Sequence, residues 1–302
     1  MTNEDLALFF ALGATLCFAS SSLVFTEFSK RVSVLWMNCF KAFVAFTALL
    51  LTIPIFSGWH PPTPMAVGGF LLSGLLGLNI GDLFLLSAFT RLGAARTLIL
   101  FGFQPLLVGI AAHFLFDQAL DPSKLIAVVF LMGCLLTFSL ESYRAEKRWE
   151  WLGLVFALVG VLFDTCGILV TRAAFSLSPN VTPMEGHFYR CLGALIGFAV
   201  MSRFKPVHLI SGFMRWTPRT RLILFSAGLG GTYLSLLLYL NALKIGHLAS
   251  VAGITITGPM FATLLESIVN RKPPSRYLLV AFALFCIGFY ILIAPSAPSA
   301  LP

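Results

Sequence analysis

Long apolar stretches dominate the chain, and short polar segments separate them. A bilayer core of about 30 Å requires roughly 20 apolar residues in a helix, and ten stretches reach or approach that length. They lie near residues 5–25, 33–56, 66–89, 94–116, 123–141, 150–172, 185–202, 221–243, 247–269 and 276–294. This pattern predicts an all-α membrane protein with ten transmembrane helices.

The first five predicted spans recur in the last five. The recurrences include Phe10-Ala11-Leu12 as Phe156-Ala157-Leu158, Lys41 as Arg190, Gly74 and Gly77 as Gly228 and Gly231, and Pro105 as Pro259. Because five is an odd number of crossings, the second copy must cross the membrane in the opposite sense. Inverted repeats are typical of secondary transporters, in which the substrate site lies near the midplane between the halves.

The repeat pattern also predicts the division of the chain. We expect a first five-helix repeat over residues 1–142, a charged connector over 143–149, a second repeat over 150–295 and a disordered tail over 296–302.

Composition agrees with a chain that lies almost wholly in the membrane. Hydrophobic residues make up 58% and charged residues only 11%, whereas soluble domains average about 25% charged residues. The net charge of +8 arises from Lys and Arg in short loops, which leaves no extended basic face for nucleic acid. Most of these basic residues follow odd-numbered spans. The positive-inside rule therefore predicts cytoplasmic odd-numbered loops and both termini outside.

Ionisable residues inside the predicted spans are the main candidates for function, because a charge in a bilayer costs several kcal/mol unless it is paired or hydrated. Lys41 and Arg190 hold equivalent positions in the second and seventh spans, while Asp82 and Asp164 lie within the third and sixth. The two cations can bind a carboxylate or phosphate of the substrate. The structural alternative is that Lys41 pairs with Asp82 and Arg190 with Asp164.

Further polar residues and two prolines extend the candidate site. Asn79 precedes Asp82 by three residues, which places both on one face of an α-helix. Pro105 and Pro259 each free a backbone carbonyl inside a span, either at the substrate site or simply at a kink. The candidate substrate-binding residues are Lys41, Asn79, Asp82, Gln104, Asp164, Arg190, Tyr233, Tyr239 and Thr257, with Asp164, Asp82 and His187 as candidates for proton coupling.

Glycines and the remaining patterns suggest packing rather than chemistry. Gly74, Gly77 and Gly81, like their counterparts in the eighth span, allow close helix approach. The chain has no His-Glu-x-x-His pattern and no nucleophile elbow, so we expect no enzyme activity, no metal site and no cofactor.

These features resemble the EamA type of the drug/metabolite transporter superfamily. Each half has a basic residue early in its second span, an Ala-rich approach to its fourth span and a proline inside that span. One departure concerns a glutamate that the family usually carries after this proline, where the present chain has Asp117 and Asn270. The resemblance implies a ten-helix bundle around a central cavity lined by spans 1–4 and 6–9, with spans 5 and 10 at the periphery.

The same resemblance implies movement of small polar metabolites, often amino acids, across the bacterial inner membrane by alternating access. We therefore expect a secondary active transporter that exports such solutes, working as a monomer or homodimer in the lipid bilayer. The main alternative is a flippase for a lipid or lipid-linked headgroup, whose phosphate Lys41 and Arg190 would bind. A lateral opening between helices would favour the flippase, and a cavity open to water would favour the metabolite transporter. A membrane scaffold without transport is a third reading.

Overall fold

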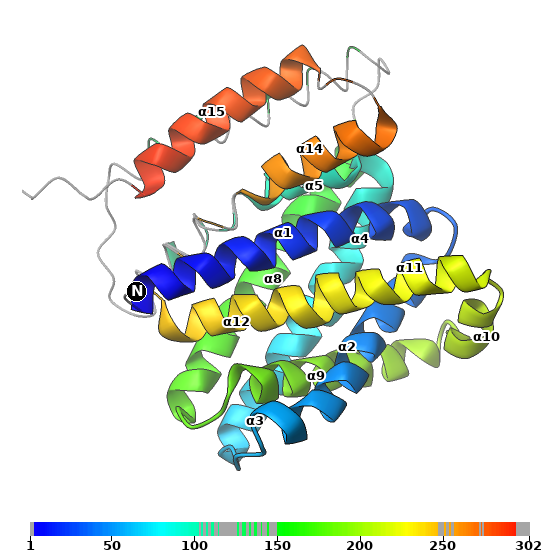
Figure 1. Cartoon of the computed structure of the whole chain (residues 1–302), viewed down its shortest axis with the longest axis vertical. Coiled ribbons are helices and arrows are strands. Elements are labelled where there is room, and N and C mark those ends of the chain that lie inside the picture. The colour runs from blue at the N-terminus through cyan, green and yellow to red at the C-terminus, as the bar shows by residue number, and fades with distance from the viewer. Residues whose placement is uncertain are drawn as a thin grey trace, which may run out of the picture.

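The computed structural model describes residues 3–102, 150–246, 257–271 and 275–293 without interruption, together with scattered residues between these ranges. Within these described residues every regular element is a helix (Figure 1). The all-α prediction is therefore confirmed. The predicted fifth span near 123–141 and most of the connector at 143–149 lie outside the continuously described ranges, as does the whole tail at 296–302.

The first repeat begins with two long helices, α1 (Asn3–Ser29) and α2 (Val34–Phe56). The third predicted span is one rod built from three segments. The segments are α3 (Pro64–Ser73), the π-helix η1 (Gly74–Gly81) and α4 (Asp82–Leu92). The described part of the fourth span is α5 (Ala94–Phe101).

The second repeat follows the same plan. Its first two spans are α8 (Trp151–Leu177) and α9 (Pro183–Ser202), and a short helix, α10 (Leu209–Met214), follows them. The eighth predicted span is again a three-part rod. It consists of α11 (Pro218–Gly228), the π-helix η2 (Leu229–Leu234) and α12 (Ser235–Ile245). The last two spans contribute α14 (Gly258–Asn270) and α15 (Arg276–Ile293).

Five of the described helices are long and apolar enough to cross a membrane. They are Asp5–Ser29, Val34–Phe56, Pro64–Leu92, Trp151–Leu177 and Pro218–Ile245. Local chemistry sets the starts of three of these helices and of α9, because Ser33, Thr63, Thr217 and Thr182 each accept a hydrogen bond from a backbone N–H of the helix that follows. Such caps satisfy amide groups that have no partner within the helix.

The two repeats interleave rather than lie apart. Helix α1 packs along α12, α2 packs against α9, and α8 packs against all three segments of the third span (Figure 1). Ala7 and Ala11 near the start of α1 share a core with Ala174 and Phe175 near the end of α8. The first helices of the two repeats therefore run in opposite directions, as inverted repeats require.

Glycines allow the closest of these contacts, as predicted. A Cβ atom on Gly74 would clash with the carbonyl oxygen of Arg190, and one on Gly193 would clash with that of Leu71. Neither position can hold a larger residue without a backbone shift. The third span is thus pressed directly onto α9, which fixes the backbone of Arg190 at the centre of the bundle.

The π-helical segments are a feature that the sequence did not predict. Both occur midway along their rods, and Gly77 in η1 corresponds to Gly231 in η2. A π-helix widens the turn and is frequent at functional sites. Because a π-helix occurs at equivalent places in both repeats, each repeat brings one widened helical turn to the centre of the bundle.

Candidate functional site

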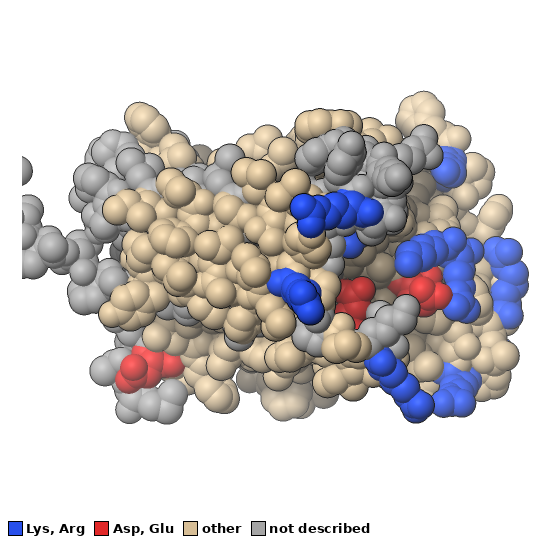
Figure 2. All heavy atoms as spheres, turned by 90° about the horizontal axis from the view of Figure 1, so that it is seen from above, with Lys and Arg blue, Asp and Glu red and all other residues tan. Residues whose placement is uncertain are grey.

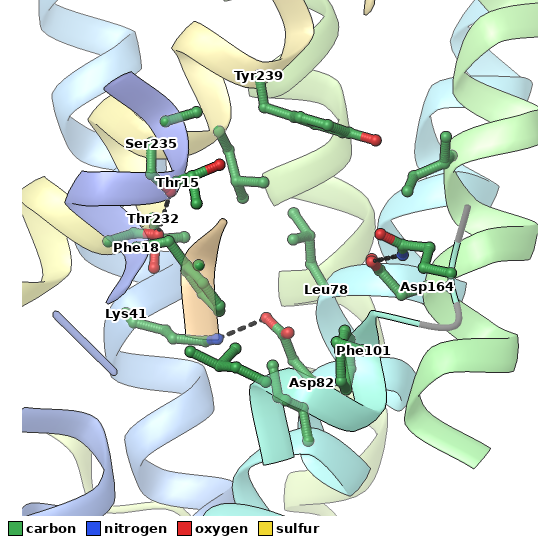
Figure 3. A pocket seen from close by; sticks show the side chains of 18 of the residues that line it. Thr15, Phe18, Lys41, Leu78, Asp82, Phe101, Asp164, Thr232, Ser235 and Tyr239 are labelled. Carbon is green, nitrogen blue, oxygen red and sulfur yellow. Dashed lines mark hydrogen bonds and ion pairs between the residues drawn. The ribbon is translucent and has the colours of Figure 1, made fainter. Parts of the chain in front are cut away.

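A central cavity of about 130 Å³ lies between the two repeats (Figure 3). Both halves contribute to its wall, from α1, α2, η1, α4 and α5 on one side and from α8, α9, η2, α12 and α14 on the other. The lining residues are Ala14, Thr15, Phe18, Lys41, Leu78, Asp82, Leu85, Leu98, Phe101, Gln104, Asp164, Ile168, Arg190, Gly231, Thr232, Ser235, Leu236, Tyr239, Gly258 and Pro259. They belong to predicted spans 1–4 and 6–9, and Figure 1 places α15 at the edge of the bundle.

Lys41 and Asp82 form a buried ion pair at the wall of this cavity. The Lys41 Nζ atom lies 2.5 Å from Asp82 Oδ2, and the two side chains are 3% and 14% exposed (Figure 3). The ammonium group also lies over the ring of Phe25, 5.4 Å from its centroid. Ion pairing and the aromatic face together offset the loss of water around the charges. This half of the structural pairing prediction is confirmed.

Asp164 is held by an amide rather than by a cation. Gln104 Nε2 donates a hydrogen bond of 2.6 Å to Asp164 Oδ2. Among the described residues no ion pair joins Asp164 to Arg190. The predicted Arg190–Asp164 ion pair is therefore not formed at contact distance. Asp164 Oδ1 and Arg190 Nη2 instead face each other near Gly77, where an added Cβ atom would lie 3.3 Å from the first and 3.4 Å from the second.

Arg190 is the largest fully buried side chain that the structure describes. Its carbonyl oxygen is fixed against Gly74, while its side chain reaches the cavity. The Nε and Nη1 atoms have no hydrogen-bond partner within the described part of the chain. A guanidinium group is always charged and carries five donors. Arg190 thus brings unused donor capacity to the cavity.

His187 lies one turn before Arg190 but does not line the cavity. Its ring is fully buried between α9 and η2, where Nε2 lies 2.8 Å from the carbonyl oxygen of Thr232. His187 therefore connects α9 to the π-helical segment of the eighth span.

Two predicted site residues point away from the cavity. Asn79 is fully buried and donates through Nδ2 to the carbonyl of Ala194 on α9, whereas Asp82 lines the cavity. The expectation that both share one face was wrong, because Asn79 lies in a π-helix whose wider turn changes the angle between them. Tyr233 in η2 donates to Thr52 Oγ1, 3.2 Å away, and also lies outside the cavity wall.

Some of the remaining predicted residues line the cavity, and others lie beside it. Tyr239 lines the cavity (Figure 3). Pro259 lines it from the first turn of α14. Thr257 comes just before that helix, and its hydroxyl donates to the carbonyl of Ile254 at 2.8 Å. Pro105 lies outside the described residues.

Sequence reasoning missed two hydroxyl groups, those of Thr15 and Ser235, which line the cavity. The alignment of the two repeats could have identified cavity-lining residues in the eighth span. Leu78 and Leu85 in the third span align with Thr232 and Tyr239 in the eighth, and all four line the cavity. Equivalent positions therefore face the same space, but the second repeat presents polar groups where the first presents leucines.

The two repeats also meet at each end of the bundle. At one end the 57–63 loop contacts the 178–182 loop and the start of α9, and we call this contact the polar seam. Glu185 accepts hydrogen bonds there from the backbone N–H of His60 and from the N–H and hydroxyl of Thr182. Thr63 N–H donates to Ser178 Oγ at 2.9 Å.

At the other end the contact is aromatic, and we call it the aromatic seam. Trp36 stacks on Phe40 with ring centroids 5.1 Å apart, and Phe40 stacks on Phe213 of α10 at 5.2 Å. Trp36 Nε1 donates to the carbonyl of His208 at 3.1 Å. This seam joins the start of α2 to the loop after α9, so it is the counterpart of the polar seam under the inverted repeat.

Basic side chains gather around the aromatic seam. Lys30 and Arg31 lie in the loop after α1, and Arg203, Lys205 and Arg215 follow α9. In Figure 2 most of the Lys and Arg side chains lie toward one end of the face drawn. The Lys and Arg residues that follow odd-numbered spans along the chain therefore also lie at one end of the bundle in space.

Comparison with known proteins agrees with this architecture. The model of the EamA-like transporter family matches residues 5–140 and again residues 151–294. These matches cover most of the chain, so the protein belongs to the EamA-like transporter family. The predicted family and the fold class of two five-helix EamA repeats are confirmed, and the chain is a multi-pass membrane protein. The more detailed borders given for the repeats and connector stay predictions.

A solved structure described only as "Crystal structure of protein" shares the fold. It has a TM-score of 0.71 and 16% sequence identity, and the alignment covers 96% of this chain and 97% of that one. No curated protein matches the chain.

Proposed function

We propose that this protein is a secondary active transporter that exports small polar metabolites, such as amino acids, by alternating access. The observation that carries the proposal is the composition of the central cavity, where charges of both signs from both repeats converge. Buried charges inside a membrane bundle are costly, and they commonly mark substrate or ion pathways. The transporter family to which the chain belongs supports the same class of activity.

The chemistry of the wall suits a small polar solute. Lys41 and Arg190 supply positive charge, and Asp82 and Asp164 supply negative charge, so the ionised wall is neutral overall. The hydroxyl groups of Tyr239 and its neighbours add hydrogen-bonding capacity. The described residues enclose about 130 Å³, which is smaller than the roughly 300–1,000 Å³ of sites for drug-sized ligands.

Alternating access follows naturally from the inverted repeats. The polar and aromatic seams are equivalent contacts at opposite ends of the bundle. A rocking motion of one repeat against the other can loosen one seam while it tightens the other, around a fixed midplane site. Asp82 and Asp164 are our candidates for a coupled proton. His187 can transmit a change at Arg190 to η2 through its contact with Thr232.

Location and assembly complete the proposal. We place the protein in a bacterial inner membrane, with the basic end and the aromatic seam in the cytoplasm, because positively charged loops are retained on that side. Its partners are the lipid bilayer and a small-molecule substrate, not nucleic acid, and one chain holds both halves of the cavity whether it works as a monomer or a homodimer.

A flippase for a phosphate-bearing headgroup is the alternative. The observation in its favour is the unused donor capacity of Arg190, since a guanidinium fork binds phosphate as well as carboxylate.

The test is thermal stabilisation of the detergent-purified protein by amino acids, nucleotides and phospholipid headgroups. A ligand that binds only the folded state raises the unfolding temperature in proportion to its occupancy. We expect stabilisation by at least one amino acid and its loss in Lys41→Ala or Arg190→Ala protein that folds at normal yield. Stabilisation by phosphate-bearing lipids alone would overturn the exporter and favour the flippase.

A further inference from the structure

The segment from residue 203 to 221 carries positive charge without any acid. It covers the loop after α9, the short helix α10 and the first turn of α11, and it contains no Asp or Glu. Its basic residues are Arg203, Lys205, Arg215, Arg219 and Arg221. All of them except Arg221 are exposed, and among the described residues none forms an ion pair. The segment therefore presents cations that no described carboxylate neutralises.

Large apolar side chains stand among these cations. Phe204 is 89% exposed, Ile210 75% and Met214 56%. Ile210 and Met214 lie four residues apart in α10, so they share one face of that helix. Exposed apolar groups that are surrounded by charged residues are typical of surfaces that contact a membrane or another protein.

The opposite face of α10 is fixed to the bundle through the aromatic seam. Phe213 stacks on Phe40 with ring centroids 5.2 Å apart, and Trp36 Nε1 donates to the carbonyl of His208 at 3.1 Å. Gly212 lies directly against the indole ring of Trp36, where a Cβ atom would clash. The helix is thus held in place by one apolar face, and the face of Ile210 and Met214 stays directed away from the bundle.

The segment lies at the level where membrane spans begin and end. Helix α1 ends at Ser29, α2 begins at Val34 and α11 begins at Pro218, and each of the three belongs to a stretch long enough to cross a membrane. Trp216 packs edge-on against Phe28 at the end of α1, with ring centroids 5.5 Å apart. In Figure 1, α10 lies beside the start of α11. The ends of spans meet the lipid headgroups, so this segment does as well.

We propose that residues 203–221 bind the headgroups of anionic phospholipids, while Phe204, Ile210 and Met214 insert among the acyl chains. Clusters of about four to eight basic residues beside a membrane span are typical of such binding, and short apolar faces of this kind lie in the interface. A zwitterionic headgroup suits the site less well, because its own cation meets only positive charge. This site is separate from the central cavity and does not depend on the proposed transport function.

A label on α10 tests insertion and headgroup preference together. In full-length protein without native cysteines, Ile210→Cys is labelled with a fluorophore and placed in phosphatidylcholine bilayers. A small fraction of lipid with brominated, quenching acyl chains is added, as either phosphatidylglycerol or phosphatidylcholine. We expect phosphatidylglycerol to be enriched at the label by about 10-fold or more, because each nearby basic residue contributes about a factor of 5. A label at Leu162→Cys is the control site, since Leu162 is exposed midway along α8, far from the cations, and should show no preference.

Charge variants connect this preference to the segment. The triple variant Arg203→Gln/Lys205→Gln/Arg215→Gln should lose the enrichment and retain the quenching, because the apolar side chains remain. The matched variant Arg203→Lys/Arg215→Lys keeps every charge and should keep most of the enrichment. About 1 M salt should also remove it, because the screening length falls to about 3 Å.

Unlabelled protein with its native cysteines provides a second measurement. Phosphatidylglycerol added to the detergent-purified protein should raise the unfolding temperature more than phosphatidylcholine does. The triple variant should lose this difference. Arg190→Gln should keep it, which distinguishes the segment from the cavity.

Three results would overturn the proposal. The first is no quenching of the label at residue 210 by either lipid, which would place α10 outside the acyl region. The second is equal quenching by both lipids, which would make the segment an apolar anchor without headgroup preference. The third is stabilisation by glycerol phosphate equal to that by phosphatidylglycerol, which would make a soluble phosphate the ligand.

Discussion

Trp36 and Glu185 occupy the same place in the two repeats, and each makes a hydrogen bond to a loop of the other repeat. Each is the third residue after the N-cap of its helix, which is Ser33 for α2 and Thr182 for α9. Trp36 donates to a backbone carbonyl, whereas Glu185 accepts from a backbone N–H. At each end of the bundle, the equivalent residue therefore joins the two repeats, by donating a hydrogen bond at one end and accepting one at the other.

The first prediction concerns the strength of these two contacts. Glu185→Gln should lower the free energy of unfolding by about 1–3 kcal/mol, because a charged acceptor with several hydrogen bonds becomes an amide with one acceptor oxygen. Trp36→Phe should cost only about 1 kcal/mol, because it loses one hydrogen bond and keeps the stack on Phe40. Thermal unfolding in detergent measures both. An unchanged unfolding temperature in Glu185→Gln would show that the polar seam does not depend on the carboxylate.

The second prediction concerns the Lys41–Asp82 pair. Lys41→Met or Asp82→Leu alone should cost about 3–5 kcal/mol, because each leaves an uncompensated charge in the protein interior. The double variant should be more stable than either single variant. A double-mutant cycle of unfolding free energies measures this coupling. Additive effects would mean that the two charges are not paired in the membrane.

Much of this architecture could be predicted from sequence. Apolar length gave the helical spans, and the repeated Lys41/Arg190 and Gly74/Gly228 positions indicated two copies around one centre. Both features arise from composition and spacing, which the bilayer constrains strongly. The close helix contacts at Gly74 likewise follow from the absence of a side chain.

The direction of individual side chains could not be predicted in the same way. The π-helical segments leave no clear pattern of residue types, because they differ from an α-helix only in which amide bonds to which carbonyl. Asn79 was therefore assigned to the face of Asp82, and Tyr233 was assigned to the cavity beside Tyr239. Nor could sequence show that Gln104, rather than Arg190, holds Asp164, because that contact depends on how the helices meet.

The third prediction uses these two tyrosines as a matched pair. The ring of Tyr239 projects into the cavity (Figure 3), whereas the hydroxyl of Tyr233 donates to Thr52 outside it. Tyr239→Phe should weaken ligand binding about 3- to 10-fold, the value of one hydrogen bond. Tyr233→Phe should leave ligand affinity unchanged. Calorimetric titration of both variants with the stabilising ligand is the measurement, and a larger effect at Tyr233 would contradict the assigned cavity wall.

The fourth prediction concerns orientation in the membrane. Lys205 at the basic end and Asn180 in the 178–182 loop of the polar seam are both exposed. In a variant without native cysteines, Asn180→Cys should react with an impermeant maleimide added to intact cells. Lys205→Cys should react only after the membrane is permeabilised, because positively charged loops stay in the cytoplasm. The opposite labelling pattern would reverse the proposed topology.

In the proposed function, small polar solutes cross the membrane through the cavity between the two repeats. Counterflow of radiolabelled amino acids into proteoliposomes loaded with the unlabelled compound tests it most directly. We predict accumulation by wild-type protein and by the control variant Gly68→Ala, in which the added Cβ atom meets nothing within 4 Å. We predict loss of accumulation in Arg190→Gln reconstituted at equal amount. Undiminished counterflow in Arg190→Gln, or no counterflow of any amino acid by the wild-type protein, would contradict the account.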